Sequence, residues 1–237
     1  MTFDEALQKV SDCKTLDELF SLWIEAHKLE TNYEETTITE PKIKKDITIP
    51  GISKDSFIKD GYINFDKYES SKRRILFILK ESNIQGYMPD SNPSEGNQVP
   101  FYTNYINGLS STNRPRQHEK MGRIAHYLFT GSDISDETVF KKDLECCAFM
   151  NVNKRGGKEK TNNKRFNNYI SKYHSFIRKQ IQIINPDYVV IIGKQIPEES
   201  FLPEGIEHLK INHTADRFHG TYKTDAYVKA FISAYEK

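Results

Sequence analysis

Arg74-Ile75-Leu76-Phe77-Ile78-Leu79 is a short run that is apolar after its first residue and ends at the polar sequence Lys80-Glu81-Ser82-Asn83. A continuous apolar run of this length is typical of a β-strand that is buried on both faces. Such strands belong to parallel sheets that are covered by helices on each side. The stretch therefore predicts an α/β protein.

Further apolar runs follow along the chain, and amphipathic helical patterns separate them. The predicted strands lie near residues 74–79, 145–151, 188–192 and 206–212. The predicted helices lie near residues 118–129 and 167–184 and after Thr224, which we expect to cap the last one. Alternating strands and helices predict a three-layer α/β/α architecture with a central four-stranded parallel sheet.

The N-terminal part of the chain has a different pattern. Thr15-Leu16-Asp17-Glu18 matches a capping box and begins an apolar stripe, which predicts a helix over residues 15–30 with a shorter helix before it. Residues 31–72 are irregular. We therefore expect residues 1–70 to form a helical appendage and wrapping segment, and residues 71–237 to form the α/β domain.

The composition excludes several classes of protein. The 237 residues are 37% hydrophobic and 28% charged, which suits a folded α/β domain and not a disordered chain. The mean hydropathy is -0.68, and no apolar run approaches the roughly 18 residues that span a membrane. Met1-Thr2-Phe3-Asp4-Glu5-Ala6 lacks the pattern of a signal peptide, so we expect a cytoplasmic protein. The three cysteines lack the spacing of a metal site, so we expect no metal and no cofactor.

The charge is unevenly distributed. The net charge is +1, but residues 1–40 carry ten acidic residues against three lysines, which leaves +8 for residues 41–237. Residues 154–165 contain six Lys/Arg against one Glu and predict a mobile basic loop. Clustered basic residues suit a polyanionic partner such as nucleic acid, and ordinary solubilising charge is the alternative. The sequence identifies no protein partner.

Three predicted strands end in polar sequences that suit chemistry. These sequences are Lys80-Glu81-Ser82-Asn83, Asn151-Val152-Asn153-Lys154 and His213-Thr214-Ala215-Asp216-Arg217. Ligands of open parallel sheets bind outside the carboxyl ends of the strands. We therefore expect Glu81, Asn151 and His213 to converge on one cleft.

This ordered set of motifs resembles the uracil-DNA glycosylase superfamily over roughly residues 71–237. In that family a buried strand runs into a water-activating loop, a middle strand ends in an Asn that reads a pyrimidine edge, and a late strand ends in a His-containing motif. The corresponding stretches here are residues 75–83, 149–153 and 212–215. Lys80 replaces a typical Gly, Ser82-Asn83 stands where a Pro often occurs, and Thr214 replaces the Pro after the His.

The resemblance implies a metal-independent glycosylase that hydrolyses the N-glycosidic bond of a flipped pyrimidine. The departures point to a modified base, for example one in phage DNA, in DNA repair or phage defence. The reaction passes through an oxocarbenium-like state, so a polar group must place water below the sugar. We expect Glu81 to do so, with Asn83 as the alternative. We expect His213 to donate to the departing base, as neutral imidazole or as cation.

The remaining expected contacts surround the flipped nucleotide. We expect Asn151 and Asn153 to alternate across the strand end, so that one of them, preferably Asn151, reads the base edge. An aromatic wall is expected from the long loop after the first strand, and its candidates are Tyr87, Phe101 and Tyr102. The expected contacts to DNA phosphates are Lys154, Arg155, Lys158 and Arg217.

Two rival functions use the same cleft. The first is an N-glycosidase that acts on free nucleotides, and the second is a non-catalytic module that binds a nucleotide or a modified base. A metal-dependent nuclease is disfavoured, because the sequence lacks a carboxylate cluster of the Asp then Glu-x-Lys kind.

Overall fold

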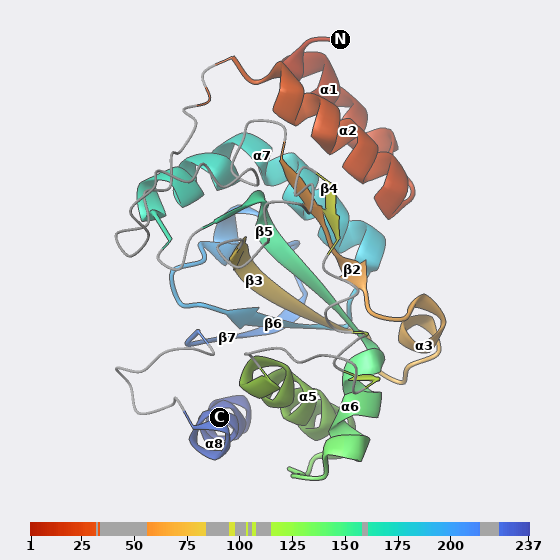
Figure 1. Ribbon diagram of the computed structural model, residues 1–237, viewed down its shortest axis with the longest axis vertical. Helices are drawn as coiled ribbons and strands as arrows, with labels where there is room; N and C mark the ends of the chain where they lie inside the picture. The colour runs from red at the N-terminus through yellow and green to blue at the C-terminus, as the bar shows by residue number, and fades with distance from the viewer. Residues whose placement is uncertain are drawn as a thin grey trace, which may run out of the picture.

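A five-stranded sheet lies at the centre of the computed structural model (Figure 1). The structure describes residues 1–31, 33, 56–83, 95–97, 103, 106–107, 115–157, 161–213 and 223–237. The strand order is β2 (Gly61–Tyr62), β5 (Cys147–Gly157), β3 (Ile75–Asn83), β6 (Tyr188–Ile192) and β7 (Glu207–Ile211). Strand β2 is antiparallel to β5, and the other neighbours are parallel. A separate parallel pair is formed by β1 (Phe57–Lys59) and β4 (Glu95–Asn97).

The predicted α/β class is confirmed, and the four predicted parallel strands are β3, β5, β6 and β7. Strand β2 was not predicted, because its two residues are too few for a periodic pattern to show. Two strands extend beyond their predicted ends. Strand β3 continues to Asn83 and β5 to Gly157, so polar residues predicted to follow the strands lie within them.

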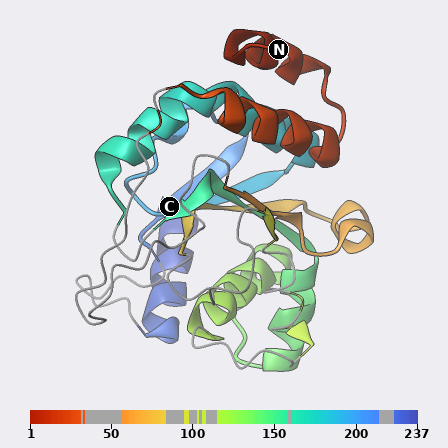
Figure 2. The same cartoon turned by 45° about the horizontal axis from the view of Figure 1, so that its top comes forward.

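Helices pack against both faces of the sheet (Figures 1 and 2). Successive side chains of a strand point to opposite faces. Leu76 and Ile78 of β3 therefore belong to one hydrophobic cluster, and Ile75 and Phe77 belong to another. The first cluster includes residues of α1 (Phe3–Lys9), α2 (Leu16–Leu29) and α7 (Asn163–Ile184). The second includes residues of α5 (Pro115–Thr130), α6 (Glu137–Glu145) and α8 (Thr224–Tyr235).

The ends of the helices follow from local sequence. The predicted capping box at α2 is present, with the Glu18 amide donating to the Thr15 hydroxyl. Helix α7 ends where Asn185 adopts a left-handed conformation (φ 49°), as the following Pro186 suggests. The predicted cap of α8 is wrong by one residue, since Lys223 is the N-cap and Thr224 the first helical residue. Short elements complete the described part: η1 (Val10–Asp12), α3 (Phe65–Glu69) and η3 (Glu198–Ser200).

The N-terminal helices share the core of the α/β domain. Trp23 of α2 is fully buried, and its ring centroid lies 5.2 Å from that of Phe176 in α7 and 5.8 Å from that of Phe57 in β1. Strand β2 also belongs to the central sheet. The boundary expected at residue 70 thus runs through one hydrophobic cluster. Within the described residues, no helix has the length and apolar character that crossing a membrane requires.

Candidate functional site

The best candidate site lies at the carboxyl ends of β3 and β5. Glu81 and Asn153 are aligned neighbours across these strands, and Asn153 Nδ2 donates a 3.0 Å hydrogen bond to Glu81 Oε2. The Thr161 side chain, just before α7, also hydrogen-bonds to Glu81. Burial raises the pKa of the half-buried Glu81 carboxyl, and the two hydrogen bonds oppose that rise. The result is a carboxyl group in a fixed orientation at the edge where parallel-sheet ligands bind.

Lys80 precedes Glu81 and points to the opposite face of β3. A Cβ atom added to Gly193, which follows β6, would lie 3.6 Å from Lys80 Cγ. Gly193 has φ +134°, a conformation that residues with a side chain rarely adopt. Burial lowers the pKa of Lys80, and the neighbouring charge of Glu81 opposes the change. Lys80 therefore lines the junction of β3 with the end of β6.

His213 lies at the same edge of the sheet but not beside Glu81. It follows β7, and β6 separates β7 from β3. At the usual strand spacing the two elements are about 10 Å apart. The chain just before His213 is held by two hydrogen bonds: Gly193 N donates to Ile211 O (2.9 Å) and Tyr227 Oη donates to Asn212 O (2.6 Å). The structure thus brings Glu81 and Asn153 into contact and places His213 two strands away.

Asn151 and Asn153 do not alternate across β5, which corrects our expectation. They are two residues apart in a regular part of the strand, so both side chains take the same face. Asn151 is only 3% exposed, and its backbone N–H donates a 2.7 Å hydrogen bond to Asp60 Oδ2. Asn153, the alternative reader, is the one that contacts Glu81.

Lys154 is not a surface residue, contrary to its predicted contact with DNA phosphate. Its side chain is fully buried, and Nζ lies 2.6 Å from both carboxylate oxygens of Asp60. Gln180 Nε2 donates a further 2.7 Å bond to Asp60 Oδ1. Burial lowers the pKa of Lys154, and the Asp60 carboxylate opposes that change. Its ammonium group serves an internal ion pair and is unavailable to a phosphate in this conformation.

Arg155 requires the same correction. Its side chain is 5% exposed, and Nη2 donates to Glu30 Oε2 (2.6 Å) and to Tyr173 Oη (3.2 Å). Lys172 of α7 also pairs with Glu30, at 2.5 Å. The predicted mobile loop is therefore, up to Gly157, an ordered strand end. Both corrections have one cause: the acidic partners Glu30 and Asp60 come from residues 1–70, which the sequence predicts to lie outside the α/β domain.

The other predicted site residues lie partly or wholly outside the described residues. For Asn83 the structure describes the backbone at the end of β3 but not the side chain. Four residues with predicted roles and one alternative fall outside: Tyr87, Phe101, Tyr102, Lys158 and Arg217. Their roles stay predictions.

Sequence reasoning missed three residues near this edge. Thr161 precedes Asn162, the N-cap of α7, and a Thr-Asn-Asn sequence before a helix was the available signal for it. Lys164 is exposed in the first turn of α7, and Lys194 is exposed directly after Gly193. Lys164 lies at the start of α7, which comes after β5, and Lys194 comes after β6, so both lie near the carboxyl edge of the sheet.

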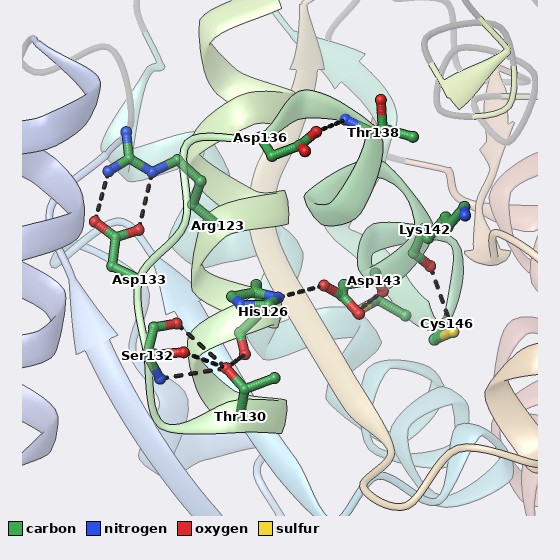
Figure 3. Close-up of polar contacts among 11 residues, drawn as sticks. Arg123, His126, Thr130, Ser132, Asp133, Asp136, Thr138, Lys142, Asp143 and Cys146 are labelled. Atoms are coloured by element: carbon green, nitrogen blue, oxygen red, sulfur yellow. Dashed lines mark hydrogen bonds and ion pairs between the residues drawn. The ribbon is translucent and has the colours of Figure 1, made fainter.

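A second polar cluster joins α5 to α6 and the loop between them (Figure 3). Arg123 donates to both carboxylate oxygens of Asp133 at 3.0 and 2.6 Å, and His126 Nδ1 lies 2.7 Å from Asp143 Oδ2. Asp143 lies just before the start of β5, where its backbone oxygen accepts a bond from Cys147 Sγ. The His126–Asp143 pair is therefore near the amino ends of the parallel strands, away from Glu81. Arg123 also donates to Asp225 Oδ1 in the first turn of α8 at 2.6 Å, so the cluster holds α5, α6 and α8 together.

Two hollows lined by described residues also lie away from Glu81. One of about 550 Å³ is bordered by α2, β2 and α3, and one of about 380 Å³ lies between the chain start and the end of α2. Among the described residues, no group of three or more His, Cys, Asp or Glu side chains is placed to hold a metal ion. Comparisons with protein-family models, curated proteins and solved structures found no match to this chain. The resemblance to the uracil-DNA glycosylase superfamily therefore rests on the sequence motifs alone.

Proposed function

We propose that this protein is a DNA glycosylase that hydrolyses the N-glycosidic bond of a flipped pyrimidine base. One observation carries the proposal: the Glu81 carboxyl group is half-buried at the carboxyl end of a central parallel strand and is oriented by two side-chain donors. A carboxylate accepts about four hydrogen bonds, and the described residues supply Glu81 with two. The remaining capacity suits a water molecule that attacks the sugar.

The base would lie between Glu81 and His213. A separation of about two strand spacings leaves room for a nucleotide between the group that orients water and the group that stabilises the leaving base. His213 would donate to a carbonyl oxygen of the departing base. Asn151 keeps its proposed role at the base edge, on the same strand face as Asn153. A base that has flipped out of the DNA stack can enter such a pocket while its neighbouring bases stay stacked.

Lys164 and Lys194 replace Lys154 and Arg155 as the proposed phosphate contacts within the described residues. Both are exposed and flank the edge that carries Glu81. Lysine side chains at the rim of a site position the phosphate backbone and leave base selection to the pocket.

A nucleotide N-glycosidase is the second candidate, and the burial of Lys154 and Arg155 favours it. Two of the four basic residues expected to bind a polymer are internal. A free nucleotide carries fewer phosphates and needs fewer such contacts. The two functions differ in their dependence on polymer length and salt, because each phosphate contact adds to the salt sensitivity of binding.

Single-turnover base release tests the proposal. The protein is incubated with DNAs that contain different pyrimidines, unmodified and modified, and with the matching nucleotides, and free base is measured by mass spectrometry. Glu81→Gln should reduce release by roughly 10- to 1,000-fold, the usual scale for a group that activates water. The matched control is Glu207→Gln, which alters an exposed carboxylate on β7 and should leave the rate unchanged.

Two outcomes would count against the proposal. Full activity of Glu81→Gln would assign the water to another group, such as Asn83. Release of no base by the unmodified protein, together with measurable binding of a modified base, would favour the non-catalytic module.

A further inference from the structure

The amide of Asn153 is occupied on both sides. Arg155 N donates to Asn153 Oδ1 at 3.1 Å, a local turn of the kind that Asn side chains form with the backbone two residues on. Asn153 Nδ2 donates to Glu81 Oε2 at 3.0 Å and, more weakly, to Gly156 O at 3.4 Å. An amide has one acceptor oxygen and two donor hydrogens, so these three bonds use each of its polar groups.

These contacts also fix which way the amide faces. A backbone N–H needs an acceptor, and a carboxylate needs a donor, so only one assignment of the Asn153 oxygen and nitrogen satisfies both neighbours. Gly156 has φ +85°, which brings its carbonyl back toward the Asn153 side chain. The turn after Asn153 therefore holds the nitrogen toward Glu81.

Thr161 approaches Glu81 from another element. It lies just before α7, whose first turn is fixed by the Asn162 side chain accepting from Arg165 N at 3.2 Å. Its hydroxyl group bonds to the same carboxyl group as Asn153. The Glu81 carboxyl group is thus hydrogen-bonded both by the end of β5 and by the residue just before α7.

We infer that Asn153 and Thr161 are positioning residues that hold Glu81 as an oriented hydrogen-bond acceptor, and that Asn153 is not a reader of the base edge. The inference rests on the proposed function for the identity of the water that Glu81 would accept a hydrogen bond from. The hydrogen bonds from Asn153 and Thr161 to Glu81 can be tested without substrate. Reading a base edge needs the amide to donate as well as to accept, and both Nδ2 hydrogens are already used, so Asn153 could donate to a base only if its bond to Glu81 or to Gly156 broke. Both donors favour the ionised carboxylate, so they oppose the effect of its burial.

Titration of Glu81 in the free protein tests these two hydrogen bonds. The side-chain carboxyl carbon is followed by NMR after labelling of glutamate, and Glu81→Gln identifies the resonance. Asn153→Ala and Thr161→Val should each raise the Glu81 pKa by roughly one pH unit, since each removes a hydrogen bond to a charged group. Asn153→Asp keeps the shape of the side chain and should raise the pKa of one of the two carboxyls further, because two carboxylates would then face each other.

Two controls separate positioning from a general structural role. Thr161→Ser keeps the hydroxyl group and should keep the Glu81 pKa. Asn64→Ala removes the N-cap of α3, which does not contact Glu81, and should lower stability without moving that pKa. An unchanged Glu81 pKa in Asn153→Ala, Asn153→Asp and Thr161→Val would overturn the inference, whatever the activity.

Base release then distinguishes the two roles of Asn153. If it positions Glu81, Asn153→Ala should slow release of every base that is cleaved by a similar factor and shift the acid limb of the pH profile upward. A change in preference between bases with an unmoved Glu81 pKa would instead make Asn153 a base reader and overturn the inference. Failure of the unmodified protein to release any base would end the proposed function but leave the NMR result intact.

Discussion

Two consecutive residues of β5 belong to very different regions. Asn153 bonds to the half-buried Glu81 at the end of the sheet, whereas Lys154 bonds to Asp60 in the fully buried interior. Because alternate side chains of a strand take opposite faces, one residue position separates a candidate site from the core. The comparison shows that a basic run in the sequence does not by itself locate a basic surface.

The two carboxylates also differ in how fully they are satisfied. Asp60 accepts from Lys154 Nζ at both oxygens, from Gln180 Nε2 and from the backbone N–H of Asn151. These bonds account for about the four that a carboxylate accepts. Glu81 accepts two from the described residues. All the hydrogen-bonding capacity of the Asp60 carboxylate is therefore used within the core, whereas the Glu81 carboxylate can accept further hydrogen bonds from another partner.

The largest expected effect on the free energy of unfolding comes from breaking the buried Asp60–Lys154 ion pair. Asp60→Asn keeps the size of the side chain but leaves the buried Lys154 without a counter-charge, and we expect the free energy of unfolding to fall by about 3–5 kcal/mol. Urea denaturation measures the change. The comparison variant Glu207→Gln breaks a pair whose carboxylate is 72% exposed, and should cost less than about 1 kcal/mol. Equal losses in the two variants would show that the Asp60–Lys154 pair is not sealed from water.

The sequence predicted the region around Glu81 better than the region around Lys154. Continuous apolar runs predicted β3, β5, β6 and β7. The rule that parallel strands end at one edge led us to expect Glu81, Asn151 and His213 in one cleft, whereas the structure places Asn153 beside Glu81 and His213 two strands away. What failed was the identification of partners distant in sequence. Asp60 is 94 residues from Lys154, and Glu30 is 125 residues from Arg155.

Local patterns carry no information about such pairings. Glu30 is the last residue of the helix predicted over residues 15–30, and Asp60 lies in the irregular stretch 31–72. Only the packing of α2 and β2 into the core showed that both acids face the basic end of β5. The same packing places residues from both sides of residue 70 in one hydrophobic cluster.

A pH titration of stability provides an intermediate effect. His27 is fully buried, with Nδ1 3.1 Å from Ser56 O and Nε2 3.0 Å from Tyr169 Oη. Burial, followed by the nearby charge of Arg155, lowers its pKa well below 6.5. Below pH 6.5, His27 is protonated in the unfolded chain but stays neutral in the folded protein. The free energy of unfolding therefore falls as the pH drops below 6.5.

The slope of the free energy of unfolding against pH measures this effect. It should approach about 1.4 kcal/mol per pH unit below pH 6.5 and flatten in His27→Gln, whereas exposed His208→Gln should keep it. Glu81 acts with the opposite sign: its raised pKa adds stability that is full below 4.5 and lost as the pH rises through its folded value. An unchanged slope in His27→Gln would contradict a neutral, sealed His27.

The smallest effect on stability should come from the exposed lysines Lys164 and Lys194, in contrast to the buried Lys154. Lys164→Gln and Lys194→Gln alter exposed side chains, so each should change the free energy of unfolding by less than about 0.5 kcal/mol. If these residues contact DNA phosphates, each variant should weaken binding and reduce the slope of log affinity against log salt by about one. Single-turnover release at saturating DNA should persist, because phosphate contacts position the substrate without breaking bonds. Unchanged affinity and salt slope in the double variant would remove both lysines from the interface, and a substrate without a polymer backbone would then account better for the burial of Lys154 and Arg155.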